Sequence, residues 1–548
     1  MAEGKTSTRP NIIIILADDM GYSDIGCYGS EINTPNIDSL SAGGVNFTQT
    51  YNCARCCPSR ASLLTGLYPH QAGIGHMVSD LGFPAYRGSL NDSCVTIAEV
   101  LKSAGYRTAM SGKWHVCNLA GKNGKRDYKT ELDNPVTPKK RGFDRFYGTL
   151  KGGGNYFNPA GLILEDKIVD YRDKGYYYTD AITEYAADII DEFSKEQDPF
   201  FLYVAYTAPH WPLHAKEEDI SKYKGHYLRG WDRIRQNRHE ELKGSGILDP
   251  GWEISKRDEL APLWEDIKEK DWEDRRMATY AAQIDCMGQG IGRIIARLKE
   301  NRIDDNTIVM FLSDNGGCAE YLAKDPKIPA FKLFDCATKD GRHVSYGNDP
   351  LVMPGGEDTF QSYDLPWANV SNTPFKLFKH WVHEGGISTP FIISWPDRIK
   401  NKNIVHSPVH LIDIMATIID ITGSEYPKEY NGNTIIPYEG ESFLPALLGR
   451  DWERDNPIFW EHEGNRAVRD RNLKLVNCYP SRWELYAMEA DRTELNDLSG
   501  RYRSDIKRLG VLYDDWAKRC GVQPWLLPAI ENIPYDIMLG YKREYWNV

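Results

Sequence analysis

The sequence lacks a long hydrophobic run, an excess of basic residues and any repeated or low-complexity tract. No apolar run reaches the roughly 20 residues of a transmembrane helix, so we expect no membrane-spanning segment. The formal net charge of −12 is spread along the chain without a basic block, which argues against a nucleic-acid partner. Residues 1–10 are polar and lack the apolar centre of a signal peptide. A periplasmic or secreted location is expected if a signal peptide has been removed, and a cytoplasmic one otherwise.

The cysteines do not form a pattern that would hold the fold together. There are 11 of them, an odd number, scattered over 548 residues, which excludes a disulfide-rich scaffold. Cys53-x-x-Cys56 by itself fits a redox or metal motif, but no distant second pair completes a zinc site. The longer pattern in which this pair stands argues against both interpretations.

Apolar runs rich in β-branched residues predict strands buried in a mostly parallel sheet. These runs are Ile12–Leu16, Tyr106–Met110, Pro199–Tyr206, Thr307–Leu312 and Phe391–Trp395. Helical patterns occur between and after them, at Thr96–Ala104, Tyr177–Lys195, Met277–Leu298 and Leu411–Gly423. The alternation of strands and helices predicts an α/β fold.

The length of the chain predicts two domains, because a single hydrophobic core does not grow to this size. Composition changes near residue 424, after which short alternating segments predict an antiparallel sheet and then a helix over Arg501–Lys518. We expect an α/β catalytic domain over residues 1–423 and a smaller α+β subdomain over residues 424–548. Within the larger domain, residues 216–275 and 318–370 are expected to be insertions.

The segment from Cys53 to Gly66 predicts a short helix that begins near Cys57. Pro58 suits its first turn and Gly66 the position just past its end. Cys56 would then lie at the positive end of the helix dipole, where anions bind. Arg60 is four residues further on and projects from the same face. A thiol, a guanidinium and a helix N-terminus would thus surround a tetrahedral oxyanion such as sulfate or phosphate.

Two pairs of oxygen-bearing side chains follow two of the predicted strands. Asp18-Asp19 comes after the first strand, and Asp314-Asn315 comes after Thr307–Leu312. Parallel strands place such residues at one edge of the sheet, where α/β folds bind ligands. One pair alone would fit a solvated turn equally well. Two pairs in equivalent positions predict a Ca²⁺-like or Mg²⁺-like site.

Further basic and titratable residues follow predicted strands. Lys113 and His115 are two residues apart, so in an extended segment they would point the same way and suit oxyanion binding and proton transfer. His210 follows Pro199–Tyr206 at the same edge, although a single histidine is more often structural. Lys379 precedes Glu384-Gly385-Gly386 and would fit a surface lysine as well.

The pattern Cys56-x-Pro58-Ser59-Arg60, followed by Leu64-Thr65-Gly66, resembles the signature of formylglycine-dependent (type I), arylsulfatase-like sulfatases of the alkaline-phosphatase-like superfamily. The resemblance extends from the first aspartate pair to Glu484-Leu485-Tyr486. It implies a large mixed, mostly parallel sheet between helices, with a C-terminal antiparallel subdomain. It also implies that Cys56 becomes formylglycine through a formylglycine-generating or anaerobic maturation enzyme.

The resemblance implies a role for each site residue. The expected Ca²⁺ ligands are Asp18, Asp19, Asp314 and Asn315. The implied catalytic residues include Cys56, whose hydrated aldehyde attacks sulfur, and Arg60, which holds that aldehyde. Lys113 and Lys379 are expected to neutralise sulfate oxygens. His115 is expected to take a proton from the hydrate, and His210 to protonate the leaving oxygen. The arginine that usually follows the Glu-Gly-Gly-Ile segment is Ser388 here, which weakens the resemblance around Lys379.

The expected function is hydrolysis of sulfate esters of a carbohydrate or an aryl alcohol. A phosphodiester or phosphonate monoester hydrolase can share the signature, and an unmodified binding protein of this fold is a further alternative. The residues expected to line the substrate pocket are Trp211, His214, His462 and Arg466. Ordinary packing or surface roles would explain these four equally well.

Overall fold

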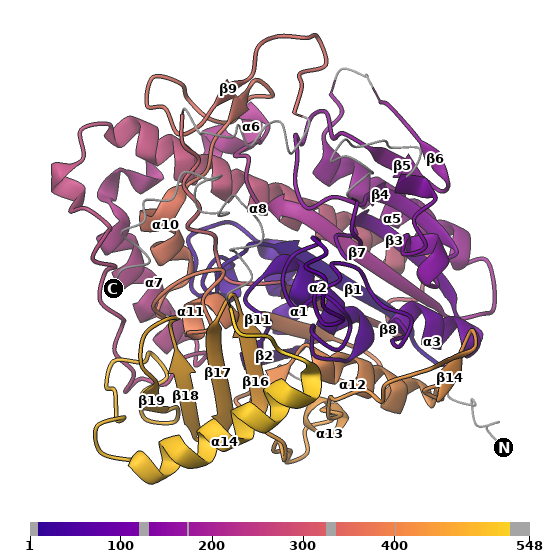
Figure 1. The fold of residues 1–548 in the computed structure, drawn as a ribbon. Coiled ribbons are helices and arrows are strands. Elements are labelled where there is room, and N and C mark those ends of the chain that lie inside the picture. The colour runs from indigo at the N-terminus through magenta and orange to yellow at the C-terminus, as the bar shows by residue number, and fades with distance from the viewer. Residues whose placement is uncertain (1–8, 120–130, 172–174, 325–335, 401, 526–548) are drawn as a thin grey trace.

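A mixed sheet of 11 strands forms the centre of the molecule (Figure 1). The structure is a computed structural model that describes the chain except for residues 1–8, 120–130, 172–174, 325–335, 401 and 526–548. In spatial order the strands are β12 (Asn403–Val405), β2 (Val45–Tyr51), β11 (Ser388–Ser394), β8 (Thr307–Ser313), β1 (Asn11–Asp18), β7 (Phe200–Pro209), β3 (Arg107–Lys113), β4 (Arg145–Thr149), β5 (Leu162–Leu164) and β6 (Lys167–Ile168), with β13 (Val409–His410) beside β2.

The central strands run parallel, as their apolar sequences predict. β1 pairs in parallel with β8 on one side and with β7 on the other, and β3 and β4 continue the parallel part. β11 is antiparallel to both β8 and β2, which makes the sheet mixed. The carboxyl ends of β8, β1, β7 and β3 therefore meet at one edge of the sheet.

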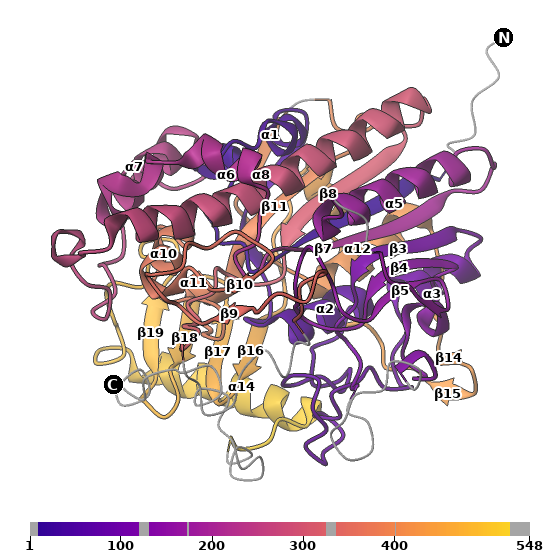
Figure 2. The ribbon, with the colours of Figure 1, turned by 90° about the horizontal axis from the view of Figure 1, so that it is seen from above.

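Helices cover both faces of this sheet (Figure 2). One face packs on α1 (Pro35–Ala42), α5 (Tyr178–Phe193) and α8 (Lys270–Glu300), and the other on α2 (Cys56–Thr65), α3 (Ile97–Ser103) and α12 (Ile412–Thr422). Alternate side chains of β1 pack on opposite faces of the sheet. Ile13 and Ile15 belong to the hydrophobic core on the first face, and Ile12 and Ile14 to the core on the second. None of the helices in the described part of the chain is long and apolar enough to cross a membrane.

The two predicted insertions contain helices and short strands as well as irregular segments. The first includes α6 (Glu217–Ile220) and α7 (Trp231–Gly244), and α8 begins within it at Lys270. The prediction that this last helix starts at Met277 was therefore wrong by seven residues. The second insertion contains β9 (Ser345–Tyr346), β10 (Thr359–Phe360) and α10 (Asp364–Ser371), and part of it lies outside the described residues.

A four-stranded antiparallel sheet and a long helix form the C-terminal part, drawn in golden orange and yellow in Figure 1. The strands are β16 (Ile458–His462), β17 (Asn465–Asp470), β18 (Leu473–Asn477) and β19 (Glu484–Ala487), and they are covered by α14 (Arg503–Cys520). The smaller elements are α11 (Glu384–Ile387), α13 (Leu444–Leu447), the hairpin β14 (Glu429–Tyr430) and β15 (Asn433–Thr434), and 3₁₀ turns at Gly26–Tyr28, Pro138–Arg141, Ser221–Tyr223, His226–Arg229 and Trp264–Asp266. The expected fold class is confirmed, while the division at residues 423 and 424 remains a prediction.

Buried ion pairs join the small sheet to the main body. Nζ of Lys474 on β18 lies 2.8 Å from Oε1 of Glu384 on α11 and 2.9 Å from Oε1 of Glu494. Nε of Arg492 lies 2.9 Å from the other oxygen of Glu384. Burial alone would raise the pKa of Glu384, but Lys474 and Arg492 lower it to about 2. The small sheet is thus held against the large one by compensated buried charges.

Candidate active site

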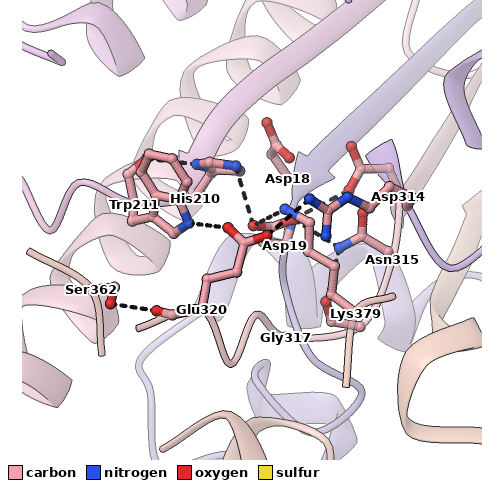
Figure 3. A network of polar contacts seen from close by, with 12 residues as sticks. Asp18, Asp19, His210, Trp211, Asp314, Asn315, Gly317, Glu320, Ser362 and Lys379 are labelled. Atoms are coloured by element: carbon pink, nitrogen blue, oxygen red, sulfur yellow. Dashed lines mark hydrogen bonds and ion pairs between the residues drawn. The ribbon is translucent and has the colours of Figure 1, made fainter. Parts of the chain in front are cut away.

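The two predicted oxygen pairs come together at the carboxyl ends of the parallel strands (Figure 3). Asp18 ends β1 and Asp19 follows it, while Asp314 and Asn315 come directly after β8. The backbone N–H of Asp19 donates to Oδ1 of Asp314 (3.2 Å), and Nδ2 of Asn315 donates to Oδ1 of Asp19 (2.8 Å). The pairs meet because β1 and β8 are adjacent parallel strands.

Two cations hold the carboxylates of Asp18 and Asp314. Nζ of Lys113, the last residue of β3, forms an ion pair with Oδ2 of Asp18. Arg60 on α2 donates from Nε (3.0 Å) and a terminal nitrogen (2.8 Å) to Oδ2 of Asp314, and it also lies 3.5 Å from Asp18. All four side chains are fully buried. Burial, together with the charge of Asp18, raises the pKa of Asp314 to about 6.

Asp19 contacts a lysine and a histidine. Nζ of Lys379 lies 2.8 Å and Nε2 of His210 lies 3.4 Å from Oδ2 of Asp19. Burial alone would raise the pKa of Asp19, but Lys379 and His210 lower it. The other ring nitrogen of His210, Nδ1, is hydrogen-bonded to the carbonyl oxygen of Trp211 (2.6 Å), so Nε2 is directed at the carboxylates. Burial lowers the pKa of His210 to about 4, and the ring is therefore neutral at pH 7.

Cys56 is the first residue of α2 and lies beside these groups. Asp18, Asp19, Cys56 and His210 each place one ligand-type atom within 4.8 Å of the others. Gly66 ends the helix in the left-handed conformation (φ 69°), as the sequence predicted. Burial raises the pKa of the Cys56 thiol to about 11, although Lys113 and Lys379 act in the opposite direction. An unmodified Cys56 is therefore a protonated thiol and a poor nucleophile at neutral pH.

His115 lies in this region with a backbone conformation that the sequence did not predict. β3 ends at Lys113, and His115 has a left-handed backbone (φ 55°), so the argument from an extended segment was wrong. Its Nε2 lies 3.3 Å from Sγ of Cys57, the neighbour of Cys56. Burial, together with Lys113 and Arg60, lowers the pKa of His115 well below its ordinary value. The neutral ring can accept a proton.

Two further charged residues belong to the site, and sequence reasoning selected neither. Nε1 of Trp211 donates to Oε2 of Glu320 (2.7 Å), whose other oxygen lies 3.0 Å from the guanidinium of Arg55 (Figure 3 shows the Trp211–Glu320 contact). Both charged side chains are almost fully buried. Arg55 could have been found as the basic residue just before Cys56. Glu320 lies in an irregular segment whose composition carries no such signal.

The donor set fits a divalent cation. Oδ1 of Asp18 and Oδ1 of Asn315 are buried and have no hydrogen-bond partner among the described residues. A buried polar atom without a partner costs about 1–3 kcal/mol, more if charged, so such an atom needs a ligand. Carboxylate and amide oxygens are the ligands that Ca²⁺ and Mg²⁺ prefer.

The comparison with protein families identifies the family of the chain. A model of the sulfatase family matches residues 10–424. The chain belongs to the sulfatase family. A second model, of the C-terminal part of N-sulphoglucosamine sulphohydrolase, matches residues 375–508 of this sulfatase.

Known sulfatases resemble this sulfatase over most of its length. It is 34% identical to an uncharacterized sulfatase of Schizosaccharomyces pombe, with 93% of each chain covered. It is also 34% identical to an arylsulfatase of Klebsiella aerogenes, over 80% of this chain and 92% of that protein. The crystal structure of Ps i-CgsB in complex with k-i-k-neocarrahexaose has a TM-score of 0.66 and 25% identity, covering 97% and 99% of the two chains. The chain is therefore an arylsulfatase-like sulfuric ester hydrolase, as the resemblance implied.

The sulfatase does not bring all four predicted pocket residues to the acidic pairs. Trp211 lies there, next to His210. The ring of His214 is fully buried and hydrogen-bonded through both nitrogens, to the backbone N–H of Tyr156 (3.3 Å) and the carbonyl oxygen of Thr359 (2.5 Å). These contacts are those of a structural histidine.

The other two candidates lie on the C-terminal sheet of the sulfatase. The guanidinium of Arg466 on β17 lies 4.6 Å from the ring centre of Trp483 and also faces Tyr513. His462 ends β16 and packs between the rings of His76 and His380. The described contacts of both residues are thus with other parts of the scaffold.

Ser388, which departs from the family pattern, contacts an arginine from another segment. A terminal nitrogen of Arg492 donates to Oγ of Ser388, while the same guanidinium contacts Glu384. A cation therefore occupies the neighbourhood of residue 388 even though that residue is not arginine. The backbone of Lys379 is also attached to the main body, since its N–H donates a hydrogen bond to the carbonyl oxygen of Gly317 (3.1 Å).

Proposed function

We propose that this sulfatase cleaves sulfate esters of carbohydrates or aryl alcohols with a formylglycine made from Cys56 and a Ca²⁺ ion bound by Asp18, Asp19, Asp314 and Asn315. The observation that carries the proposal is the position of Cys56: it starts α2 and lies within the same 4.8 Å group as Asp18, Asp19 and His210. The carbohydrate alternative is supported by the likeness to Ps i-CgsB, whose structure contains an oligosaccharide. The aryl alternative is supported by the likeness to the Klebsiella arylsulfatase.

The absent groups would supply what the chain itself lacks. Hydrated formylglycine offers two hydroxyls on one carbon, so a covalent ester formed by one hydroxyl can be broken with the help of the other. Bound Ca²⁺ offers positive charge next to the reacting oxygen atoms. The modification requires a formylglycine-generating or an anaerobic maturation enzyme as partner.

The cationic side chains bind and orient the sulfo group. Lys113 and Lys379 are buried, with 0% and 2% exposed side chains, and both lie against the acidic pairs. A cation in a water-poor site stabilises an oxyanion far more than a cation at the surface does. Arg60, which contacts Asp18 and Asp314, is held in a fixed orientation and keeps residue 56 and the acidic pairs together.

Two histidines are placed to move protons. His115 is neutral and buried, so its ring can take a proton from a hydroxyl at residue 56. His210 has its Nδ1 fixed by the Trp211 carbonyl, and we assign its Nε2 as the atom that gives a proton to the leaving oxygen. The negative charge of a bound sulfate ester raises the pKa of a neighbouring imidazole and so favours the protonated form that this step needs.

The decisive experiment replaces Cys56. We expect Cys56→Ala to abolish sulfate ester hydrolysis while the circular dichroism spectrum and melting temperature stay unchanged. Cys27→Ala, at a half-buried cysteine outside the site, is the matched control and should retain turnover. Retained activity in Cys56→Ala would refute the mechanism.

Two further measurements separate the proposal from its alternatives. The mass of a tryptic peptide that contains residue 56, from a host with the maturation enzyme, should correspond to an aldehyde; an intact thiol there would favour a binding protein. Sulfate and phosphate esters with the same aryl leaving group should be compared on one preparation. A phosphodiester that is by far the better substrate would overturn the assignment as a sulfatase.

A further inference from the structure

A second group of ligand-type side chains lies on the C-terminal side of the molecule. His76, His462 and Glu463 each place one nitrogen or oxygen atom within 4.8 Å of the others. Nδ1 of His76 lies 3.2 Å and Nε2 of His462 lies 3.7 Å from Oε1 of Glu463. The first residue belongs to an irregular segment after α2, and the other two lie where β16 turns towards β17.

The ring of His462 is buried and has no hydrogen-bond partner among the described residues. It is 0% exposed, and neither of its nitrogens has a hydrogen-bond partner within the part of the chain that the structure describes. Such an imidazole costs free energy unless a ligand satisfies it. Its Nε2 faces the same carboxylate oxygen, Oε1 of Glu463, as the ring of His76 does.

The remaining oxygen of Glu463 is held by a hydrogen-bonded histidine. Nδ1 of His380 lies 3.1 Å from Oε2 of Glu463, and Nδ2 of Asn465 lies 3.2 Å from Nε2 of the same ring. An amide nitrogen can only donate, so Nε2 of His380 accepts a hydrogen bond from Asn465. Nδ1 of His380 therefore carries the hydrogen and donates a hydrogen bond to Glu463. A ligating carboxylate with a hydrogen bond on its other oxygen is the usual outer support of a metal ligand.

We propose that Nδ1 of His76, Nε2 of His462 and Oε1 of Glu463 bind a Zn²⁺ ion. Two imidazoles and one carboxylate form a recurrent three-residue zinc set, completed by water in the fourth position. Zinc ligands at about 2.0–2.1 Å in a tetrahedron lie roughly 3.3 Å from one another. The 3.2 Å and 3.7 Å separations are close to that value. Ring nitrogens select zinc or a related transition metal rather than Ca²⁺.

The burial of this group favours an ion over a larger ligand. The exposed fractions are 9% for His76, 0% for His462 and 8% for Glu463, which leaves no face on which a sugar ring could stack. The ion would connect the segment around residue 76 to the β16–β17 turn and, through His380, to the loop that carries Lys379. The assignment does not depend on the reaction proposed above, because none of these ligands is Cys56 or an acidic-pair residue.

Metal content of purified protein tests the site. Wild type is stripped with a chelator, supplied with excess Ca²⁺ and titrated with Zn²⁺, and bound zinc is measured by mass spectrometry after gel filtration. We expect one tightly bound Zn²⁺ per chain in wild type and in His226→Gln, a control at an exposed histidine. His462→Gln and Glu463→Gln should each weaken binding at least about 100-fold, since loss of outer partners alone costs about 10–100-fold.

Cobalt distinguishes this site from the one around Cys56. Co²⁺ bound by nitrogen and oxygen ligands should give visible d–d absorption that persists in Cys56→Ala and is lost in His462→Gln. The proposal is overturned if wild type does not bind zinc tightly, if His462→Gln binds it as wild type does, or if the cobalt absorption is lost entirely in Cys56→Ala. Should His462→Gln not fold, as judged by circular dichroism, His76→Gln at the rim of the group provides the same comparison.

Discussion

Replacing His210 by glutamine separates proton donation from simple positioning. In the structure Nδ1 of His210 is held by the Trp211 carbonyl, and Nε2 lies 3.4 Å from Oδ2 of Asp19. Glutamine preserves a polar side chain of similar reach but cannot give up a proton. If His210 protonates the leaving oxygen, the variant should lose most activity on esters whose alcohol is a poor leaving group.

The size of the loss follows from general acid catalysis. A positioned acid contributes about 10²–10⁴-fold, or about 2.7–5.4 kcal/mol at 1.36 kcal/mol per tenfold. An acidic phenol leaves as its anion and needs little of this help. We therefore expect less than about a tenfold loss for nitrophenyl sulfate and about 10²–10⁴-fold for an alkyl or carbohydrate sulfate.

The assay measures kcat/KM for a series of sulfate esters with increasingly basic leaving groups. The logarithm of kcat/KM should fall more steeply with leaving-group pKa in His210→Gln than in wild type. His239→Gln is the matched control, because Nε2 of His239 also contacts a tryptophan carbonyl, that of Trp252 (3.0 Å), but outside the site. A loss by the same factor for every ester would refute the assignment and leave His210 a positioning residue.

Three further perturbations test other parts of the structure. Lys474→Met should destabilise the protein by about 3–5 kcal/mol in urea unfolding, because it removes one of the two cations that compensate the buried carboxylate of Glu384 and also the cation beside Glu494; a change below about 1 kcal/mol would contradict this. Gly152→Ala should lower turnover at least about tenfold with little change in stability, since its Cβ would lie 2.3 Å from Cε1 of His115, whereas Gly244→Ala, with open space around its Cβ, should behave as wild type. Chelation of Ca²⁺ should abolish turnover and resupply should restore it; full activity in chelator would argue against the calcium proposal.

The layout of the acidic pairs could be predicted because it depends only on local patterns. Apolar β-branched runs fix β1 and β8 as buried parallel strands, and such strands end at one edge of a sheet. The residues that follow them therefore meet, and Asp18 and Asp314 do. Helix α2 was predictable for a similar reason, because Pro58 and Gly66 mark its first turn and its end.

Features that depend on long-range contacts or irregular segments could not be predicted from local sequence patterns. The left-handed backbone of His115 just after β3 leaves no compositional trace, and Glu320 reaches the site from an irregular segment. α8 starts before its apolar pattern does, because Trp272 in its first turn donates to the carbonyl oxygen of Val352, far away in sequence. His76 and His462 come together only through the packing of the small sheet, which periodicity does not describe.

The charges of the site constrain how cation and substrate bind. The carboxylates of Asp18 and Asp314 are balanced by Arg60 and Lys113, and Asp19 is balanced by Lys379 in the same way. Adding a divalent cation alone would therefore leave a buried excess of positive charge, and adding a singly charged sulfate ester alone would leave a buried excess of negative charge. Bound together they leave less excess charge than the cation does alone, so each should strengthen the binding of the other. On the proposed function, the apparent affinity for Ca²⁺ should rise when a sulfate ester is present, and the KM for the ester should rise as Ca²⁺ is withdrawn.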